Sequence, residues 1–413
     1  MAADPASEPM SEPAPEPEPV SDPSSEPAPD RGPLADVLVV DLTRALAGPH
    51  AAMMLGDMGA RVIKVEPPAG DDTRSWGPPF IGEDDEREST YFLSANRNKE
   101  SLVLDLKLEA DRDVLARLVE RADVLMENYR VGVLDRLGFP VERLHDLNPR
   151  LVVLSITGFG HDGPEAKRAG YDQIAQGEGG LMSITGTAQP TKAGVPIADL
   201  LAGMNGAFGV LAALHERART GRGRVVRTSL LAGMIGVHAF QGTRWTVAGE
   251  VPGLAGDHHP SIAPYGMFAT ATAPVQIACG SEGLWRALCG ALGWDPAEPE
   301  LATNPLRVAN RDRLVARIEE LFADRPAEHW LALLADAGVP SGKVRSMDDV
   351  YGWEQTLSQG LLLSVQHATQ GTVRLPGSAV RFDDNPFSGG RPTHEAPPTL
   401  DQHGAAIREW LES

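Results

Sequence analysis

Cysteine and positive charge are both scarce in this chain of 413 residues. The two cysteines, Cys279 and Cys289, form neither a metal-like pair nor a disulfide framework, so we expect a reduced, soluble, cytoplasmic protein. Lys and Arg number 37 against 57 Asp and Glu, which gives a formal net charge of −20. So acidic a chain is unsuited to nucleic acid or an anionic membrane as its general partner, although it is compatible with a local basic pocket.

Long apolar runs are also absent. No stretch reaches the roughly 18 consecutive apolar residues that predict a membrane-spanning helix. The first 30 residues contain eight acidic residues and nine prolines but no Lys or Arg. A segment of this composition buries too little apolar surface to offset the entropy lost on ordering. We therefore expect residues 1–32 to form a disordered acidic tail, which lacks the basic and apolar regions of a signal peptide.

Several motifs of known chemistry are missing as well. No G-x-S-x-G motif of serine hydrolases occurs. The turn at residues 42–48 lacks the three glycines of a dinucleotide site, and the literal G-x-G-x-x-G at 158–163 opens no apolar helix, so we expect no NAD site. His258 and His259 have no further ligand at metal-binding spacing, so we expect no metal site either.

What the sequence does contain is a regular alternation of apolar runs and helical patterns. Strands are predicted over residues 37–42, 61–65, 101–104, 124–126, 151–156 and 225–228. Helices are predicted over residues 47–58, 110–121, 141–147, 199–214 and 230–247. This alternation predicts an α/β fold with a doubly wound, Rossmann-like parallel sheet.

The pattern changes beyond about residue 252. A Gly- and Pro-rich loop precedes a predicted strand at 275–278 and helices at 283–292 and 311–322, which we interpret as a smaller α+β domain. Strands at 344–347 and 372–375 and a helix at 399–411 are predicted to return to the large domain. The expected organisation is a discontinuous large domain, residues 33–230 and 341–413, around a linker helix and small domain, residues 231–340.

A single carboxylate, Asp199, stands at the start of a long apolar helical pattern. There it can be a helix cap or first-turn acid, favoured by the helix dipole. A carboxylate in an apolar wall can also be a nucleophile that forms covalent acyl intermediates. The stretch alone does not decide between these two interpretations.

Polar residues flank two of the predicted strands. Asn98 and Lys107 lie on either side of the strand at 101–104, and Asn128, with Arg136 beyond it, follows the strand at 124–126. Such side chains suit phosphates and an adenine edge, and loops at the carboxyl ends of parallel strands bind ligands. The alternative for each of them is an ordinary solvated loop. Tyr171 and Asp172 mark a further site edge, for which the alternative is a helix cap by Asp172.

The order of motifs along the chain resembles the class III (formyl-CoA transferase-like) CoA-transferase family. The matching stretches are V-V-D-L-T-R-A-L-A-G-P at 39–49, G-A-R-V-I-K-V-E-P-P at 59–68, G-D-D-T-R at 70–74, N-R-N-K-E-S-L-V-L-D-L-K at 96–107, D-V-L-M-E-N-Y at 123–129, S-I-T-G-F-G at 155–160, R-A-G-Y-D at 168–172 and G-V-P-I-A-D-L at 194–200. The patterns T-R-x-W-G-P-P at 73–79 and H-x-S-I-x-P-Y at 259–265 are similar to the branch that acts on dicarboxylates. Leu46 stands where the formyl/oxalate branch has Gln, which argues against formyl-CoA and oxalate.

This resemblance implies that Asp199 is the catalytic aspartate and that two subunits interlock as a homodimer. It also implies CoA or acyl-CoA as substrate rather than a permanently bound cofactor. By motif position, the residues implied to line the CoA site are Leu104, Lys107, Asn128, Tyr129 and Arg136, to which we add Asn98.

The reaction expected from this resemblance moves CoA from an acyl-CoA, such as succinyl-CoA, to a small dicarboxylate through aspartyl anhydride and aspartyl-CoA intermediates. Backbone N–H groups near Asp199 are the expected oxyanion donors. The residues expected to bind the acceptor are Arg44, Arg74, Arg168, Tyr171 and His259. Two alternatives stay open: an α-methylacyl-CoA racemase on the same fold, which needs a second acid–base group where this chain has Tyr171, and a non-catalytic CoA-binding protein.

Overall fold

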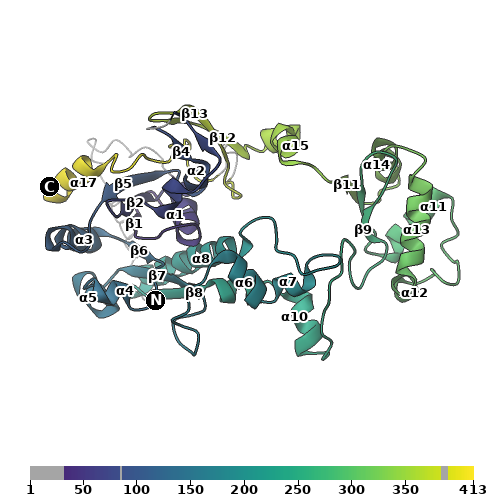
Figure 1. Ribbon diagram of the computed structural model, residues 1–413, viewed down its shortest axis with the longest axis horizontal. Coiled ribbons are helices and arrows are strands. Elements are labelled where there is room, and N and C mark those ends of the chain that lie inside the picture. The colour runs from purple at the N-terminus through teal and green to yellow at the C-terminus, as the bar shows by residue number, and fades with distance from the viewer. Residues whose placement is uncertain (1–31, 84–85, 383–388) are drawn as a thin grey trace, which may run out of the picture.

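A computed structural model describes residues 32–83, 86–382 and 389–413 (Figure 1). The predicted disordered tail therefore lies, but for Gly32, outside the described residues. The main feature is a six-stranded sheet of order β5-β2-β1-β6-β7-β8, in which every neighbouring pair is parallel. Its strands are β1 (Leu38–Asp41), β2 (Arg61–Glu66), β5 (Lys99–Val103), β6 (Val124–Glu127), β7 (Val152–Thr157) and β8 (Val225–Ser229). The predicted parallel sheet is confirmed.

Helices cover both faces of this sheet because successive apolar residues of each strand point to opposite sides. Val39 and its neighbours pack against α1 (Ala47–Asp57) and α8 (Ile197–Thr220). Val40 and its neighbours pack against α3 (Glu109–Arg121), α5 (Val141–Leu147) and the C-terminal helix α17 (Gly404–Glu412). The last helix of the chain thus joins a layer built by the first third of the sequence.

A second, antiparallel sheet of order β11-β10-β9 has its own core around Trp285, Phe322 and Trp330. Figure 1 shows this part set apart from the large sheet. Its elements are β9 (Tyr265–Phe268), β10 (Val275–Ala278), α11 (Glu282–Leu292), α12 (Asn304–Ala309), α13 (Arg311–Phe322), α14 (Ala327–Asp336) and β11 (Ser341–Lys343).

The prediction of a strand at 344–347 is wrong. The strand is β11, which ends at Lys343 and pairs with β10 of the small sheet. Val344 is 51% exposed and has no buried face to pack in a sheet. Ser346 instead caps α15 (Met347–Gly352) by accepting a hydrogen bond from the backbone N–H of Asp349.

The helix predicted at 230–247 is interrupted. It consists of α9 (Leu230–Gly236) and α10 (Ala239–Thr246), with Ala239 in the left-handed region at φ 47°. His238 between them contacts the carbonyl oxygen of Gly179 through Nε2 at 2.7 Å. The helix is therefore broken at this contact, although the apolar pattern of the sequence continues through it.

The strand predicted at 372–375 is confirmed as β13 (Gly371–Pro376). Among the described strands it pairs with β12 (Leu362–His367) and not with the large sheet. The remaining elements are η1 (Asp72–Ser75), β3 (Phe80–Ile81), β4 (Glu88–Ser89), α2 (Thr90–Ala95), α4 (Val133–Arg136), α6 (Asp172–Glu178), α7 (Leu181–Ile184) and α16 (Glu354–Ser358).

Helix α8 is apolar enough, by length and by a mean hydropathy of 1.6, to cross a membrane, which the search for unbroken apolar runs did not anticipate. Core helices of soluble proteins pass the same test, and α8 packs closely on α1 and β7. A Cβ atom on Gly203 would lie 2.5 Å from the carbonyl oxygen of Ala47. Small residues therefore let α8 approach α1, and this packing argues for a core helix.

Candidate active site

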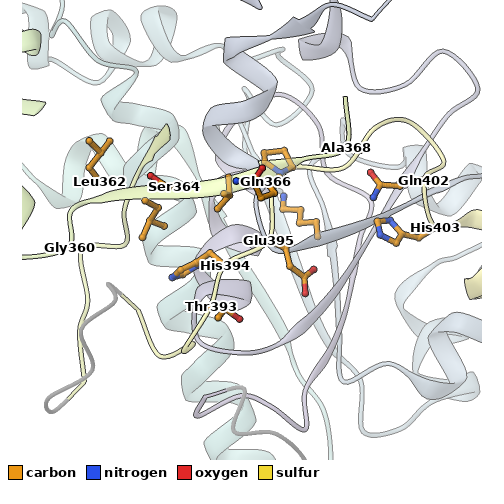
Figure 2. Close-up of a pocket in the computed structure, with 15 residues that line it drawn as sticks. Gly360, Leu362, Ser364, Gln366, Ala368, Thr393, His394, Glu395, Gln402 and His403 are labelled. Carbon is orange, nitrogen blue, oxygen red and sulfur yellow. The ribbon is translucent and has the colours of Figure 1, made fainter. Parts of the chain in front are cut away.

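One cavity, with a volume of about 810 Å³, does not include Asp199. Figure 2 shows it between the segment from Leu362 to Ala368 and the residues Thr393–Glu395 and Gln402–His403. Polar groups on its wall are already engaged, since Lys99 Nζ pairs with Asp41 at 3.0 Å and His403 Nδ1 accepts from the N–H of Ser101 at 3.2 Å. Size alone therefore does not identify the reactive site.

A smaller cavity, of about 310 Å³, lies at the carboxyl edge of the large sheet and contains Asp199. The strand order reverses between β1 and β6, and the loops after these strands meet there. The N–H of Arg44 donates to Asn128 Oδ1 at 2.9 Å, and Asn128 Nδ2 donates to the Arg44 carbonyl at 2.8 Å. Open α/β sheets bind ligands at such a switch point, so we take this cleft as the candidate active site.

Asp199 occupies the first turn of α8 but does not cap it. The residue before the helix is Pro196, which provides no side-chain cap. Asp172 supplies it from α6: its Oδ1 accepts from the backbone N–H groups of Ala198, at 2.8 Å, and Asp199, at 3.4 Å. These two N–H groups, which we expected to be free for an oxyanion, are therefore already engaged.

The Asp199 carboxylate has an unusual electrostatic setting. Within the described residues no group donates a hydrogen bond to it, and burial together with the nearby charge of Asp172 raises its pKa to about 7. Burial and the same two carboxylates raise the pKa of Tyr91 to about 12, so its phenol stays neutral. A carboxylate without hydrogen-bond donors and of raised pKa is a strong nucleophile once ionised.

Tyr91 and Trp76 are cleft residues that the sequence interpretation missed. Tyr91 lies on α2, and its ring meets that of Trp76 edge-on, with centroids 5.0 Å apart. Only the fold brings Tyr91 of α2 into the same cleft as Asp199 of α8. The sequence offered one indication of their role: Trp76 lies within the motif at 73–79, and Tyr91 lies between that motif and the one at 96–107.

Four more of the predicted residues line the cleft with Asp199 and Asn128: Arg44, Tyr129, Arg168 and Tyr171. The Arg44 guanidinium carbon lies 5.7 Å from the Tyr129 ring centroid, and Arg44 forms no ion pair with any described residue. Arg168 pairs with Glu178 and, at 3.6 Å, with Glu165. Arg44 is therefore the predicted cleft cation that has no carboxylate partner among the described residues, although it contacts Tyr129.

Three predicted residues lie elsewhere. Arg74 forms a two-point ion pair with the buried Glu66, with both N–O distances 2.7 Å. Asn98 stands at the amino end of β5, where its Nδ2 donates to Asp57 and its Oδ1 accepts from the N–H of Glu395. His259 belongs to the small-sheet region and stacks on Phe240 at 5.2 Å.

The remaining three predicted residues follow strands at the carboxyl edge without lining the cleft itself. Leu104 is buried in the core beneath that edge. Lys107 and Arg136 are exposed, after β5 and at the end of α4. Two cations along one edge suit the phosphates of an extended ligand whose reactive end reaches the cleft.

The fold and cleft are those expected of an α/β enzyme, with a carboxylate at the switch point of the sheet. Residues 34–404 match the family described as CoA-transferase family III, and the chain belongs to this family. The family and the enzyme class predicted from the motifs, a CoA-transferase, are confirmed. Metal ligation finds no support in the described ranges, where no group of three or more His, Cys, Asp or Glu residues could hold an ion.

Curated relatives extend over nearly the whole chain. An acetyl-CoA:oxalate CoA-transferase of Acetobacter aceti is 40% identical over 391 residues, which cover 92% of this chain and 96% of that protein. A human succinyl-CoA:glutarate CoA-transferase is 38% identical, covering 91% of this chain and 85% of that protein. A crystal structure of a CAIB/BAIF family protein from Brucella suis superposes with a TM-score of 0.82 at 41% identity, covering 92% of this chain and all of that one.

Proposed function

We propose that this CoA-transferase moves CoA from an acyl-CoA such as succinyl-CoA to a small dicarboxylate, with Asp199 as nucleophile. The observation that carries the proposal is the Asp199 carboxylate, which lies in the switch-point cleft without a hydrogen-bond donor among the described residues. The relatives named for oxalate and for glutarate support a small dicarboxylate as acceptor. Because one of them is named for oxalate, Leu46 alone does not exclude that acid.

CoA enters as a substrate in this scheme. Asn128 and Tyr129 line the cleft, and Lys107 and Arg136 lie exposed on the same edge, so the nucleotide end extends toward these two cations. Leu104 is buried in the core and supports this edge from beneath without contacting CoA. Asn98 contributes to holding the chain before β5, since its amide already contacts Asp57 and Glu395.

The chemistry conserves the thioester energy. The Asp199 carboxylate attacks the donor thioester carbonyl, which forms a mixed anhydride and releases CoA thiolate. The thiolate attacks the aspartyl carbonyl, which releases the donor acid and leaves an aspartyl-CoA thioester. The acceptor carboxylate attacks this thioester and expels CoA thiolate. Finally the thiolate attacks the acceptor carbonyl of the new anhydride, which yields the product acyl-CoA and regenerates Asp199.

Cleft residues divide the remaining tasks. Arg44, without an ion pair among the described residues, binds the distal carboxylate of the acceptor, and Arg168 and Tyr171 border the entrance. Because the N–H groups of Ala198 and Asp199 are engaged by Asp172, the neutral phenol of Tyr91 is the better oxyanion donor. Arg74 serves instead to hold the loop before the cleft through Glu66.

Mixing the protein with succinyl-CoA and hydroxylamine is expected to leave a hydroxamate on Asp199, because hydroxylamine traps activated acyl groups. Peptide mass spectrometry locates the adduct. Asp199→Asn should carry none, while the exposed Asp162→Asn should match the wild type. Deuterium exchange at the α-carbon of a branched acyl-CoA without any adduct would favour the racemase, and CoA binding without either reaction would favour the non-catalytic protein.

We also propose that the protein is a homodimer of interlocked subunits. We propose a cytoplasmic location, which is consistent with two cysteines that are both free and buried. Support comes from an uncovered apolar stripe on α8. Met204, Phe208 and Leu211, at helical spacing, are 47%, 74% and 39% exposed. An apolar stripe of this kind on a long helix is typical of a subunit interface.

Light scattering is expected to give twice the chain mass of 44.0 kDa for the wild type. Phe208→Glu, which places a charge in the stripe, should yield monomer or aggregate, because a buried unpaired charge opposes association. Leu108→Glu, at an exposed apolar position before α3, is the matched control and should stay dimeric. An unchanged mass for Phe208→Glu would place the interface elsewhere.

A further inference from the structure

Asp172 makes contacts that its own helix does not need. It opens α6, yet its carboxylate extends to the start of α8, where Oδ1 accepts from the N–H groups of Ala198 and Asp199. Its Oδ2 accepts from Gln176 Nε2 at 2.7 Å, and Gln176 Oε1 accepts from the N–H of Ala193 at 2.8 Å. One turn of α6 therefore holds both the segment before α8 and the first turn that carries Asp199.

A negative residue is not required for this cap. Ser, Thr or Asn caps a helix about as well as Asp, without adding charge. Asp172 instead places a carboxylate beside a second carboxylate that must be ionised to react. Two neighbouring carboxylates disfavour each other's charge.

The charge has a consequence for the covalent steps. When Asp199 becomes part of an anhydride or thioester it is neutral, and its repulsion with Asp172 disappears. The pair therefore opposes free ionised Asp199 but not the modified enzyme. A carboxylate of raised basicity is also the stronger nucleophile.

We propose that Asp172 is a positioning residue of the transfer reaction: it fixes Asp199 through two backbone hydrogen bonds, and its charge favours the states in which Asp199 is covalently modified. This inference rests on the proposed nucleophilic role of Asp199. It assigns the Tyr171–Asp172 edge of the cleft a role in the chemistry itself.

Other charged and titratable groups face the cleft from several elements. Burial and Asp172 are nevertheless the causes that raise the pKa of Asp199. On α1, which packs against α8, His50 interacts with Arg97, Asp57 and Lys99 instead. The cleft groups are Arg44 after β1, Asp72 on η1, Tyr91 on α2, Tyr129 and Arg130 after β6, and Arg168 and Tyr171 before α6.

The test compares wild type with Asp172→Asn, whose amide oxygen can accept the same two N–H groups without charge. The readout is the pH profile of kcat/KM for transfer from succinyl-CoA, because Asp199 must be ionised to attack. The acid limb, expected near pH 7 in the wild type, should move about one unit lower in the variant. The hydroxamate trapped per enzyme at pH 8 should fall severalfold, while the thermal midpoint should fall only by the loss of one hydrogen bond, because the Asn amide nitrogen cannot accept from Gln176.

Asp172→Ser, a second neutral cap, provides the same comparison if the Asn variant does not fold. An acid limb that stays in place in a folded, active neutral variant would overturn the inference. A purely structural role predicts lower activity at every pH with the limb unmoved. Failure of the proposed function is distinguishable, because wild type itself would then show no hydroxamate on Asp199.

Discussion

Asp199→Asn is expected to lower kcat for CoA transfer by about 10⁴-fold or more, because an amide cannot form the anhydride. The same variant is expected to be more stable than wild type at pH 8. Its thermal midpoint, measured beside residual transfer activity, checks both results. A variant that keeps a tenth of the wild-type kcat would remove Asp199 from the covalent mechanism.

The stability gain follows from the raised pKa of Asp199, which burial and Asp172 move from 3.8 to about 7. The folded protein holds this proton more tightly than the unfolded chain, so stability is lost as the pH rises from about 4 to about 7. Above that range, ionised Asp199 lowers the free energy of unfolding by about 1–3 kcal/mol, a figure reduced to allow for its partial exposure to solvent. Asn is neutral throughout, so its advantage should grow from pH 5 to pH 8. An advantage of equal size at both pH values would contradict this origin.

Local patterns predicted the large sheet well because most of its strands are short, buried runs separated by helical patterns. The run from Val37 to Leu42 and the helix after it needed no long-range information. The strand near residue 344 failed for the opposite reason. β11 reads Ser341-Gly342-Lys343 and has no apolar signal of its own, so only pairing with β10 defines it.

Site residues were predicted correctly where the local sequence motif indicates their role. They were not predicted where the role depends on a contact with a residue distant in the sequence. Asp199 stood out between apolar residues and glycines. Arg74 was predicted to bind the acceptor, but its Nε and Nη2 groups both donate to the carboxylate of Glu66. Asp172 was weighed as a cap for its own helix, whereas the structure uses it to cap α8. Such pairings arise from the crossing of elements, which no local pattern encodes.

Lys64→Met is expected to destabilise the fold by about 3–5 kcal/mol, the usual penalty for leaving a buried charge without its partner. Lys64 Nζ lies 2.8 Å from Asp71 Oδ2, and both side chains are fully buried. Burial alone would raise the pKa of Asp71, but Lys64 and the hydrogen bonds from Thr73 hold it below its usual value. Urea denaturation at pH 7 and fixed protein concentration measures the loss.

The same variant should also lower transfer activity, because the pair supports the turn that lines the cleft. Lys64 donates to the carbonyl oxygen of Thr43 at 2.9 Å, and the N–H of Ala45 donates to Asp71 at 3.3 Å. Ala45 has φ 63°, a conformation that persists only where its surroundings fix it. The exposed Lys343→Met, in the small sheet, is the matched control and should change stability by less than about 0.5 kcal/mol. The double variant Lys64→Met/Asp71→Leu should regain part of the stability, since no lone charge remains buried, but not the activity, since the turn stays unsupported. Full recovery of both would show that the pair acts on stability alone.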